Sequence, residues 1–87
     1  MDDARLKGRR VLITGAGSGI GRALAERALG AGAEATLVDL RADSLSDLHG
    51  AAECHAMDVA DADAWARLPR SHSGFDFVAL NAGVMSA

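Results

Sequence analysis

The chain has 87 residues, 49% of them hydrophobic, and a formal net charge of -3 at pH 7. The hydrophobic content excludes a disordered chain, and the negative charge gives no reason to expect a nucleic acid or an anionic membrane as partner. The length allows at most one small domain, and a domain of this size buries only about 60% of its unfolded surface. No apolar run approaches the roughly 20 residues that span a bilayer, and the single cysteine is Cys54, so we expect a soluble, cytoplasmic protein without a signal peptide.

The first predicted strand, residues 9–14, ends in a cluster of glycines, and an Ala- and Leu-rich helix follows at residues 19–31. Strand, glycine turn and helix in this order are the context in which a glycine fingerprint indicates a dinucleotide site. Gly15 would allow a tight turn, Gly19 a close approach of a pyrophosphate to the backbone, and Gly21 close packing of the helix on the strand. The start of the helix would offer free N–H groups and the positive end of its dipole to the phosphates.

The face of this helix that we expect to pack on the sheet is defined by apolar residues at helical spacing. Ala25 is expected on the opposite side, and Gly30 or Gly32 would end the helix in a left-handed turn. The predicted packing face consists of Ile20, Ala23, Leu24 and Ala28.

An acidic residue follows the glycines at the separation that is typical of ribose binding. An acid about 20 residues beyond the glycines hydrogen-bonds the hydroxyls of the adenosine ribose. The second predicted strand, residues 33–39, ends in Asp39 at about this separation. Its carboxylate would repel a 2′-phosphate, which favours NAD over NADP, while the guanidinium of Arg41 could pair with that phosphate and is the opposing indication. Asp39 could instead be a solvated strand end or a helix cap.

The remaining segments continue the alternation of helix and strand. Connections long enough for a helix call for parallel strands joined by right-handed crossovers. The expected elements are a short helix at 42–49, a strand at 53–57, a helix at 61–68 and a strand at 75–80.

The spacing Thr14-Gly15-x-x-x-Gly19-x-Gly21 resembles the short-chain dehydrogenase/reductase family, which comprises nicotinamide-dependent oxidoreductases on a Rossmann fold. Many NADP-using members carry a basic residue where this chain has Ser18, so the resemblance adds to the preference for NAD. The cofactor-binding residues that the resemblance and the pattern together imply are Gly15, Ser18, Gly19, Ile20, Gly21, Asp39, Asp58, Val59, Asn81, Ala82 and Gly83.

Two further stretches match the family pattern. The resemblance implies that Asp58 and Val59, which follow the third strand, contact the adenine ring; Asp58 could instead cap the following turn. The run Asn81-Ala82-Gly83 would flank the nicotinamide side of the cofactor, although the family's usual run is Asn-Asn-Ala-Gly and Leu80 replaces its first Asn. Asn81 could also be a purely structural residue at the strand end.

The expected fold class is therefore α/β, a Rossmann-type parallel sheet with flanking helices, of which only the first half is present. The expected strand order is 3-2-1-4, with the cofactor at the carboxyl ends of the strands, where the order reverses between strands 1 and 4. We expect residues 1–87 to form a single, incomplete NAD(P)-binding Rossmann domain.

The catalytic residues of the family have no counterpart in this sequence. The family uses a Ser and a Tyr-x-x-x-Lys pair, whereas this chain has no tyrosine and a single lysine, Lys7. We therefore predict no catalytic residue and an inactive isolated chain. The expected function is that of the cofactor-binding N-terminal part of a truncated NAD(P)-dependent oxidoreductase, which when complete would transfer hydride between NAD(H) and an alcohol or carbonyl substrate. The alternatives are a non-catalytic dinucleotide-binding module or sensor and, disfavoured by the glycine spacing, a methyltransferase that uses S-adenosylmethionine.

Two expectations concern metal binding and assembly. His49, Cys54 and His55 lack the spacing of metal ligands, so no metal site is expected. The fourth strand would form an exposed edge of the sheet, and such an edge favours self-association. The side chains that it would leave poorly covered are Phe75, Phe77, Val78 and Leu80.

Overall fold

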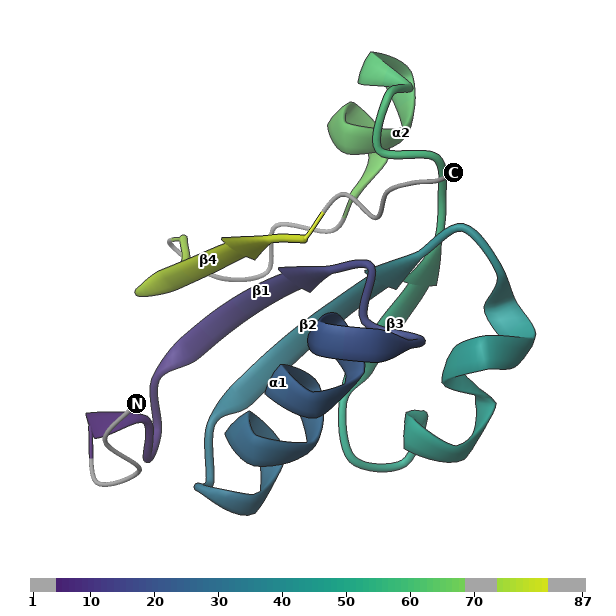
Figure 1. The fold of residues 1–87 in the computed structure, drawn as a ribbon. Coiled ribbons are helices and arrows are strands. Elements are labelled where there is room, and N and C mark those ends of the chain that lie inside the picture. Colours follow the sequence, from purple (N-terminus) through teal and green to yellow (C-terminus); the bar gives the residue numbers. More distant parts are fainter. Residues whose placement is uncertain (1–4, 69–73, 82–87) are drawn as a thin grey trace.

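The computed structural model describes residues 5–68 and 74–81 (Figure 1). Strands and helices alternate along the chain as predicted, and their ends agree with the predicted ends to within two residues. The elements are β1 (Arg10–Thr14), α1 (Gly19–Gly30), β2 (Glu34–Asp39), the 3₁₀ helix η2 (Ala42–Leu48), β3 (Glu53–Ala56), α2 (Ala62–Arg67) and β4 (Phe77–Leu80).

The four strands form one parallel sheet in the order β3-β2-β1-β4. Leu12 of β1 lies opposite Thr36 of β2 on one side and Val78 of β4 on the other. The predicted Rossmann-type order 3-2-1-4 is thus confirmed. Because all the strands run in the same direction, the residues that follow them gather at one end of the sheet, next to the point where the order reverses.

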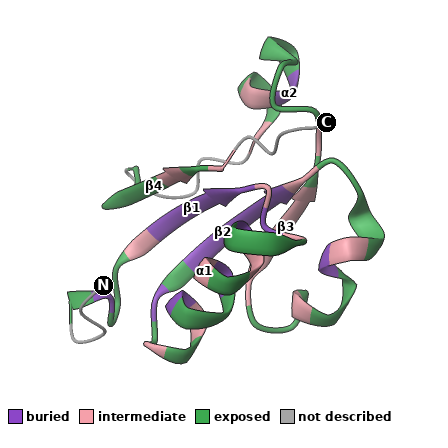
Figure 2. Cartoon of the chain, viewed as in Figure 1, coloured by how far each residue is buried: buried purple, intermediate pink, exposed green. Residues whose placement is uncertain are grey.

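The core lies around the two central strands, β1 and β2, whose residues are buried on both faces of the sheet (Figure 2). Continuous apolar runs are typical of parallel strands with both faces covered. Ile13 and Leu37 are almost completely buried in the cluster beneath α1. Helix α1 packs on β1 and β2, and η2 packs on β2 and β3. These two helices therefore hold the segments that follow β1 and β2.

The buried face of α1 differs from the predicted one. It consists of Gly21, Ala25 and Ala28, whereas Ile20 is 73% exposed and Ala23 is also exposed. These buried positions follow the helical spacing i, i+4 and i+7. The placement of Ala25 on the opposite side was therefore wrong. The small residues, and not the larger Ile20, face the sheet because they allow the helix axis to approach the strands closely.

The segment predicted as a short helix at 42–49 is a 3₁₀ helix, η2. Ser44 Oγ donates to the Arg41 carbonyl at 2.7 Å, and Ser46 Oγ donates to the Asp43 carbonyl at 3.0 Å. Serine hydroxyls that bond to carbonyls three residues earlier compete with regular α-helical bonds and fit the tighter 3₁₀ winding. Leu45 is the one residue of η2 that is fully buried, and it anchors η2 on the core.

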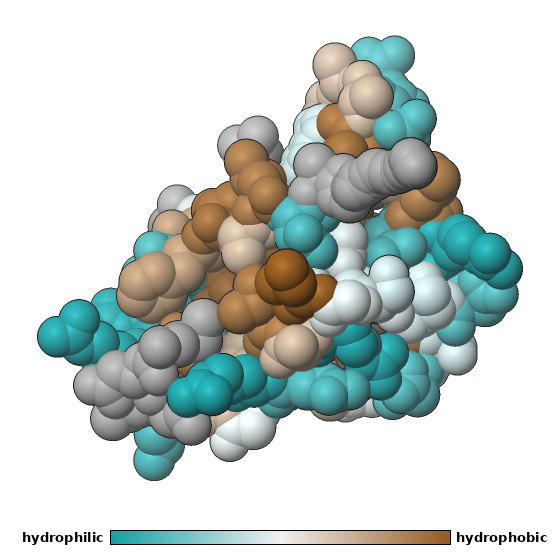
Figure 3. All heavy atoms as spheres, viewed as in Figure 1, coloured by the Kyte–Doolittle hydropathy of each residue, from teal (hydrophilic) through white to brown (hydrophobic). Residues whose placement is uncertain are grey.

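Strand β4 is the exposed edge that the sequence predicted. Phe77 is 47% exposed, Val78 52% and Leu80 71%. Within the described part of the chain, β4 pairs only with β1. Figure 3 shows brown, hydrophobic surface over the region where β4 lies. An apolar sheet edge of this kind is a surface at which a further chain segment can pair.

Within residues 5–68 and 74–81, no helix is long and apolar enough to cross a membrane, and no group of three or more His, Cys, Asp or Glu side chains could hold a metal ion. Burial, followed by the negative charge of Asp47, raises the pKa of the Cys54 thiol. The Cys54 thiol is therefore protonated and a poor nucleophile at neutral pH.

Candidate functional site

A cleft of about 530 Å³ opens at the carboxyl ends of the strands. Its volume falls within the roughly 300–1,000 Å³ of typical ligand sites. Among the described residues that were predicted to bind a cofactor, only Gly21 does not line it, and Ala82 and Gly83 lie outside the described residues. The lining residues are Gly15, Ser18, Gly19, Ile20, Asp39, Leu40, Met57, Asp58, Val59 and Asn81.

The turn between β1 and α1 depends on glycines in the left-handed region of backbone space. Gly15 has a φ of +63° and Gly19 a φ of +59°, a region that residues with a Cβ rarely adopt. A Cβ built on Gly19 would meet nothing within 4 Å. The backbone at Gly19 therefore borders open space in the cleft, as expected of a position that a ligand approaches.

Gly21, the predicted close-packing glycine, lies buried where β1, α1 and β4 meet. A Cβ at Gly21 would overlap the Gly15 carbonyl and lie 2.7 Å from Asn81 Nδ2. A Cβ at Gly15 would in turn overlap the backbone carbonyl of Asn81, whose Nδ2 is 3.5 Å from the Gly15 carbonyl oxygen. Asn81 therefore fills the space beside the turn at the end of β4.

The side chain of the N-cap residue does not cap the N-terminus of α1. Ser18 is the N-cap residue, with an extended backbone (φ -155°, ψ 163°), yet its side chain makes no capping hydrogen bond, and the first turn of α1 carries no acidic residue. The first N–H groups of a helix need partners from outside the helix, and its positive dipole end favours an anion. The start of α1, beside the cleft, is thus suited to bind a phosphate.

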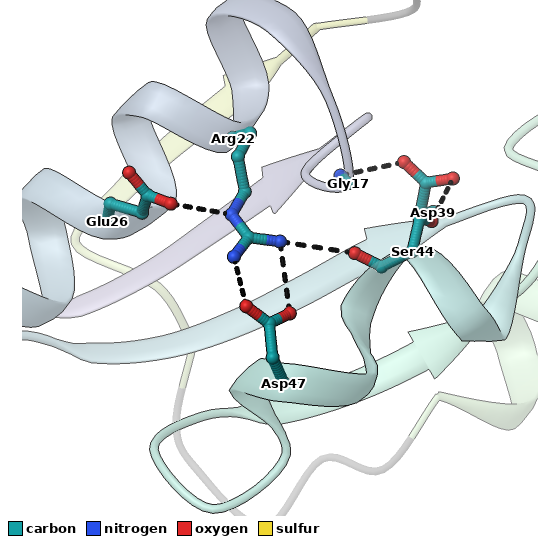
Figure 4. A network of polar contacts seen from close by, with 6 residues as sticks. All are labelled: Gly17, Arg22, Glu26, Asp39, Ser44 and Asp47. Carbon is teal, nitrogen blue, oxygen red and sulfur yellow. Dashed lines mark hydrogen bonds and ion pairs between the residues drawn. The ribbon is translucent and has the colours of Figure 1, made fainter.

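Asp39 lies where the glycine turn meets η2, and its carboxylate is held by both. Its Oδ2 accepts the Gly17 N–H at 2.8 Å, and its Oδ1 lies 3.2 Å from both Ser44 Oγ and the Arg41 backbone nitrogen (Figure 4). Asp39 is therefore not simply a solvated strand end. The carboxylate connects the turn after β1 to the segment after β2 and still borders the cleft.

Gly17 was not among the predicted site residues, although the structure requires a glycine there. A Cβ on Gly17 would overlap Ser44 Oγ and lie 2.8 Å from Asp39 Oδ2. The sequence contained one indication of this role: Gly17 lies inside the turn, although the family spacing does not require a glycine at that position. Its role depends on the packing of η2 against the turn, which the spacing does not reveal.

The residues that follow β3 also line the cleft. Asp58 Oδ1 accepts the Ala60 N–H at 2.9 Å, so one oxygen of this carboxylate caps the following turn, which is the alternative role considered above. Trp65 Nε1 donates to the Val59 carbonyl at 2.8 Å and holds Val59 at the cleft.

Apolar side chains also border the cleft. Ile20 is 73% exposed, Leu40 69% and Val59 40%. Leu40 and Met57 were not predicted to line the site, although each directly follows the end of a strand, and the cleft lies at the strand ends. Exposed apolar side chains around a cleft are suited to cover a flat, apolar ligand face.

An arginine that the sequence analysis did not assign to the site joins α1 to η2 (Figure 4). The Arg22 guanidinium pairs through two nitrogens with the Asp47 carboxylate, and Nε lies 2.8 Å from Glu26 Oε2. Its Nη1 also donates to the Ser44 carbonyl at 3.2 Å. The hydrogen bond from Arg22 lowers the pKa of Asp47, and the hydrogen bonds to Asp47 and then Glu26 raise the pKa of Arg22.

Comparison with known proteins identifies the family. The family model for short chain dehydrogenases matches residues 9–87. The chain belongs to the short-chain dehydrogenase family. A solved short-chain dehydrogenase from Streptomyces avermitilis matches the chain with a TM-score of 0.59 at 39% sequence identity, covering 63% of this chain and 22% of that one.

Two curated members of the short-chain dehydrogenase family are similar in sequence. The 2-keto-3-deoxy-L-fuconate dehydrogenase of Xanthomonas campestris is 42% identical over 86 residues, which cover 93% of this chain and 28% of that protein. The D-erythrulose reductase of Gallus gallus is 38% identical over 87 residues, which cover 94% of this chain and 35% of that protein. The chain thus spans about a third of the length of these relatives.

Proposed function

We propose that the chain binds NAD as the cofactor-binding N-terminal part of an NAD(P)-dependent short-chain oxidoreductase. The observation that carries this proposal is the position of the Asp39 carboxylate in the same cleft as the start of α1, where the Ser18 side chain makes no capping hydrogen bond. A helix start suited to a phosphate and an acid suited to a ribose are the two polar features that a dinucleotide needs at a Rossmann sheet. The complete enzyme would transfer hydride between NAD(H) and an alcohol or carbonyl substrate.

Each part of the cofactor has a proposed place along the cleft. The pyrophosphate would lie against Gly15, Ser18, Gly19 and Ile20, with Gly21 packed beneath them. The adenine would lie between the apolar side chains of Ile20, Leu40 and Val59, with Asp58 beside its amine. The nicotinamide side would be flanked by Asn81, Ala82 and Gly83.

The ribose would bind to Asp39 at the acceptor site of the carboxylate that its present contacts leave open. A carboxylate has about four lone-pair sites, and three donors already surround that of Asp39. Ser44 has one hydroxyl hydrogen and two acceptors, the Arg41 carbonyl at 2.7 Å and Asp39 Oδ1 at 3.2 Å. The hydrogen is shared between these two acceptors, so Ser44 still contacts Asp39, and the fourth lone-pair site of the carboxylate is open to a ribose hydroxyl.

The contacts of Arg41 support NAD as the preferred cofactor. Its guanidinium lies 3.2 Å from Asp43 Oδ2 and 3.4 Å from Asp43 Oδ1, and this hydrogen bonding lowers the pKa of Asp43. The cation that could pair with a 2′-phosphate thus already has an acidic partner, while the Asp39 carboxylate would repel that phosphate.

A titration of the full chain with NADH and, separately, NADPH tests the proposed function. Trp65 holds Val59 at the cleft, so quenching of Trp65 fluorescence should report a bound nucleotide. We expect saturable binding that is at least about tenfold tighter for NADH, a difference of about 1.4 kcal/mol. A folded chain, verified by circular dichroism, that binds neither nucleotide at millimolar concentration would contradict the proposal.

We further propose that the chain self-associates through the exposed edge strand β4. Val78 is 52% exposed in the middle of β4, and a lysine on an edge strand opposes pairing with another strand. Sedimentation velocity of the wild type should show a concentration-dependent shift to larger species, and Val78→Lys should reduce it. Val59→Lys is the matched control, because Val59 is also exposed but lies outside the sheet. A wild type that stays monomeric at high concentration would refute this proposal.

A further inference from the structure

The ion-pair network in Figure 4 connects two elements that are far apart in the sequence. Arg22 lies in the first turn of α1 and contacts Asp47 and the Ser44 carbonyl, both in η2. The Arg22 side chain is 24% exposed, compared with 58% for Glu26 and 63% for Asp47. A planar guanidinium that pairs with a carboxylate through two nitrogens fixes orientation as well as distance. Arg22 therefore fixes η2 relative to the start of α1.

Ser44 links the position of η2 to that of the Asp39 carboxylate, because it contacts both Arg22 and Asp39. Its backbone carbonyl accepts from Arg22 Nη1, and its side-chain oxygen lies 3.2 Å from Asp39 Oδ1. Asp39 in turn accepts the Gly17 N–H through Oδ2. Arg22, Ser44, Asp39 and Gly17 thus form a continuous chain of polar contacts that returns to the turn preceding α1.

We propose that Arg22 is a positioning residue that holds η2, and through Ser44 the Asp39 carboxylate, so that the cleft discriminates between NADH and NADPH. The inference rests on the proposed function, because the discrimination concerns the same site. Arg22 is placed away from the cofactor, since it does not line the cleft. Arg22 would act through the position of the Asp39 carboxylate. If this carboxylate moves, it becomes a poorer acceptor for a ribose hydroxyl and repels a 2′-phosphate less.

The chain offers a matched pair of variants that tests this role. Arg22→Ala removes the contacts to η2, whereas Glu26→Ala removes the other partner of Arg22, which lies within α1 and does not contact η2. We expect Arg22→Ala to lower the ratio of NADH to NADPH affinity roughly fivefold, as coupled neighbouring residues do, and Glu26→Ala to leave it unchanged. Arg22→Lys should restore the ratio only in part, because an ammonium lacks the planar fork that reaches Asp47 and Ser44 together.

A second readout does not depend on cofactor binding. The Gly17 amide reports the position of Asp39, because it donates to Asp39 Oδ2 at 2.8 Å. In the NMR spectrum of the nucleotide-free chain, Arg22→Ala should shift the Gly17 amide resonance and speed its hydrogen exchange, and Glu26→Ala should do neither. Asp47→Asn is the second variant if Arg22→Ala does not fold, and it should give the same effects.

The outcomes separate this inference from the proposed function. A wild type that binds neither nucleotide contradicts the proposed function, and the Gly17 amide then still tests whether Arg22 positions Asp39. An Arg22→Ala variant that folds, keeps the wild-type affinity ratio and keeps the wild-type Gly17 amide would overturn the inference. Equal losses of NADH and NADPH affinity would also overturn it, since they would show a general structural role.

Discussion

Replacement of Asp39 by alanine is expected to abolish the preference for NADH and to destabilise the turn before α1. The change removes the acceptor of the Gly17 N–H and the partner of the Ser44 hydroxyl. Hydrogen bonds to a charged group contribute about 1.5–3 kcal/mol, and we expect a loss of about 2 kcal/mol in the free energy of unfolding. The affinity ratio between NADH and NADPH should fall at least about tenfold, to near unity. Fluorescence titration and urea unfolding measure the two effects.

Two further variants separate the roles of Asp39. Asp39→Asn keeps an oxygen that can accept from Gly17 but removes the charge, so it should lose the preference for NADH while retaining more of the stability. Glu34→Ala is the matched control, because it removes one acidic side chain from the opposite end of the same strand, where Glu34 is exposed. If Asp39→Ala binds both nucleotides with the wild-type ratio, then Asp39 does not contact the ribose.

Replacement of Gly21 by alanine is expected to unfold the chain or nearly so. A Cβ at this position would overlap the Gly15 carbonyl and lie 2.7 Å from Asn81 Nδ2, and the turn and β4 would have to move. Overpacking typically costs about 1–3 kcal/mol, and because backbone atoms are involved here we expect about 3 kcal/mol. This is a large part of the stability of a small domain. Urea unfolding followed by circular dichroism measures the change.

Gly30→Ala is the control for Gly21→Ala within the same helix. A Cβ on Gly30 would meet nothing within 4 Å, so the change carries no steric cost. Alanine is the stronger helix former, and Gly30→Ala should raise the free energy of unfolding by up to about 1 kcal/mol. Opposite signs for the two variants would show that space, and not helix propensity, requires the glycine at position 21. A Gly21→Ala variant as stable as the wild type would contradict the close packing of α1 on β1.

The fold and the general position of the site could be predicted because their determinants are local or strongly patterned. Glycines follow directly after β1, and Asp39 ends β2, so parallel strands alone bring them to one edge of the sheet. The face of α1 could not be predicted in the same way. Hydrophobicity ranks Ile20 above Ala25, whereas the packing distance selects the smaller residue, and only the assembled sheet sets that distance.

The contacts that hold Asp39 could not be predicted because they join residues from separate segments. Gly17 and Asp39 are 22 positions apart, and Arg22 and Asp47 are 25 apart. Nothing in the local pattern around Arg22 indicates that its guanidinium crosses to η2 rather than pairing only with Glu26, which lies one helical turn away. The choice depends on how η2 packs, and the 3₁₀ winding of η2 was itself not predicted.

The contacts of the Asp39 carboxylate to both Gly17 and Ser44 matter for protein engineering. Neutralising a ribose-binding acid would favour NADP, and the acid that we propose for this role, Asp39, also joins the loop after β1 to the segment after β2. A design that alters position 39 must therefore provide a new acceptor for the Gly17 N–H, for example from a redesigned side chain at position 44. Under the proposed function, cofactor selectivity and folding depend on the same carboxylate, so they have to be redesigned together.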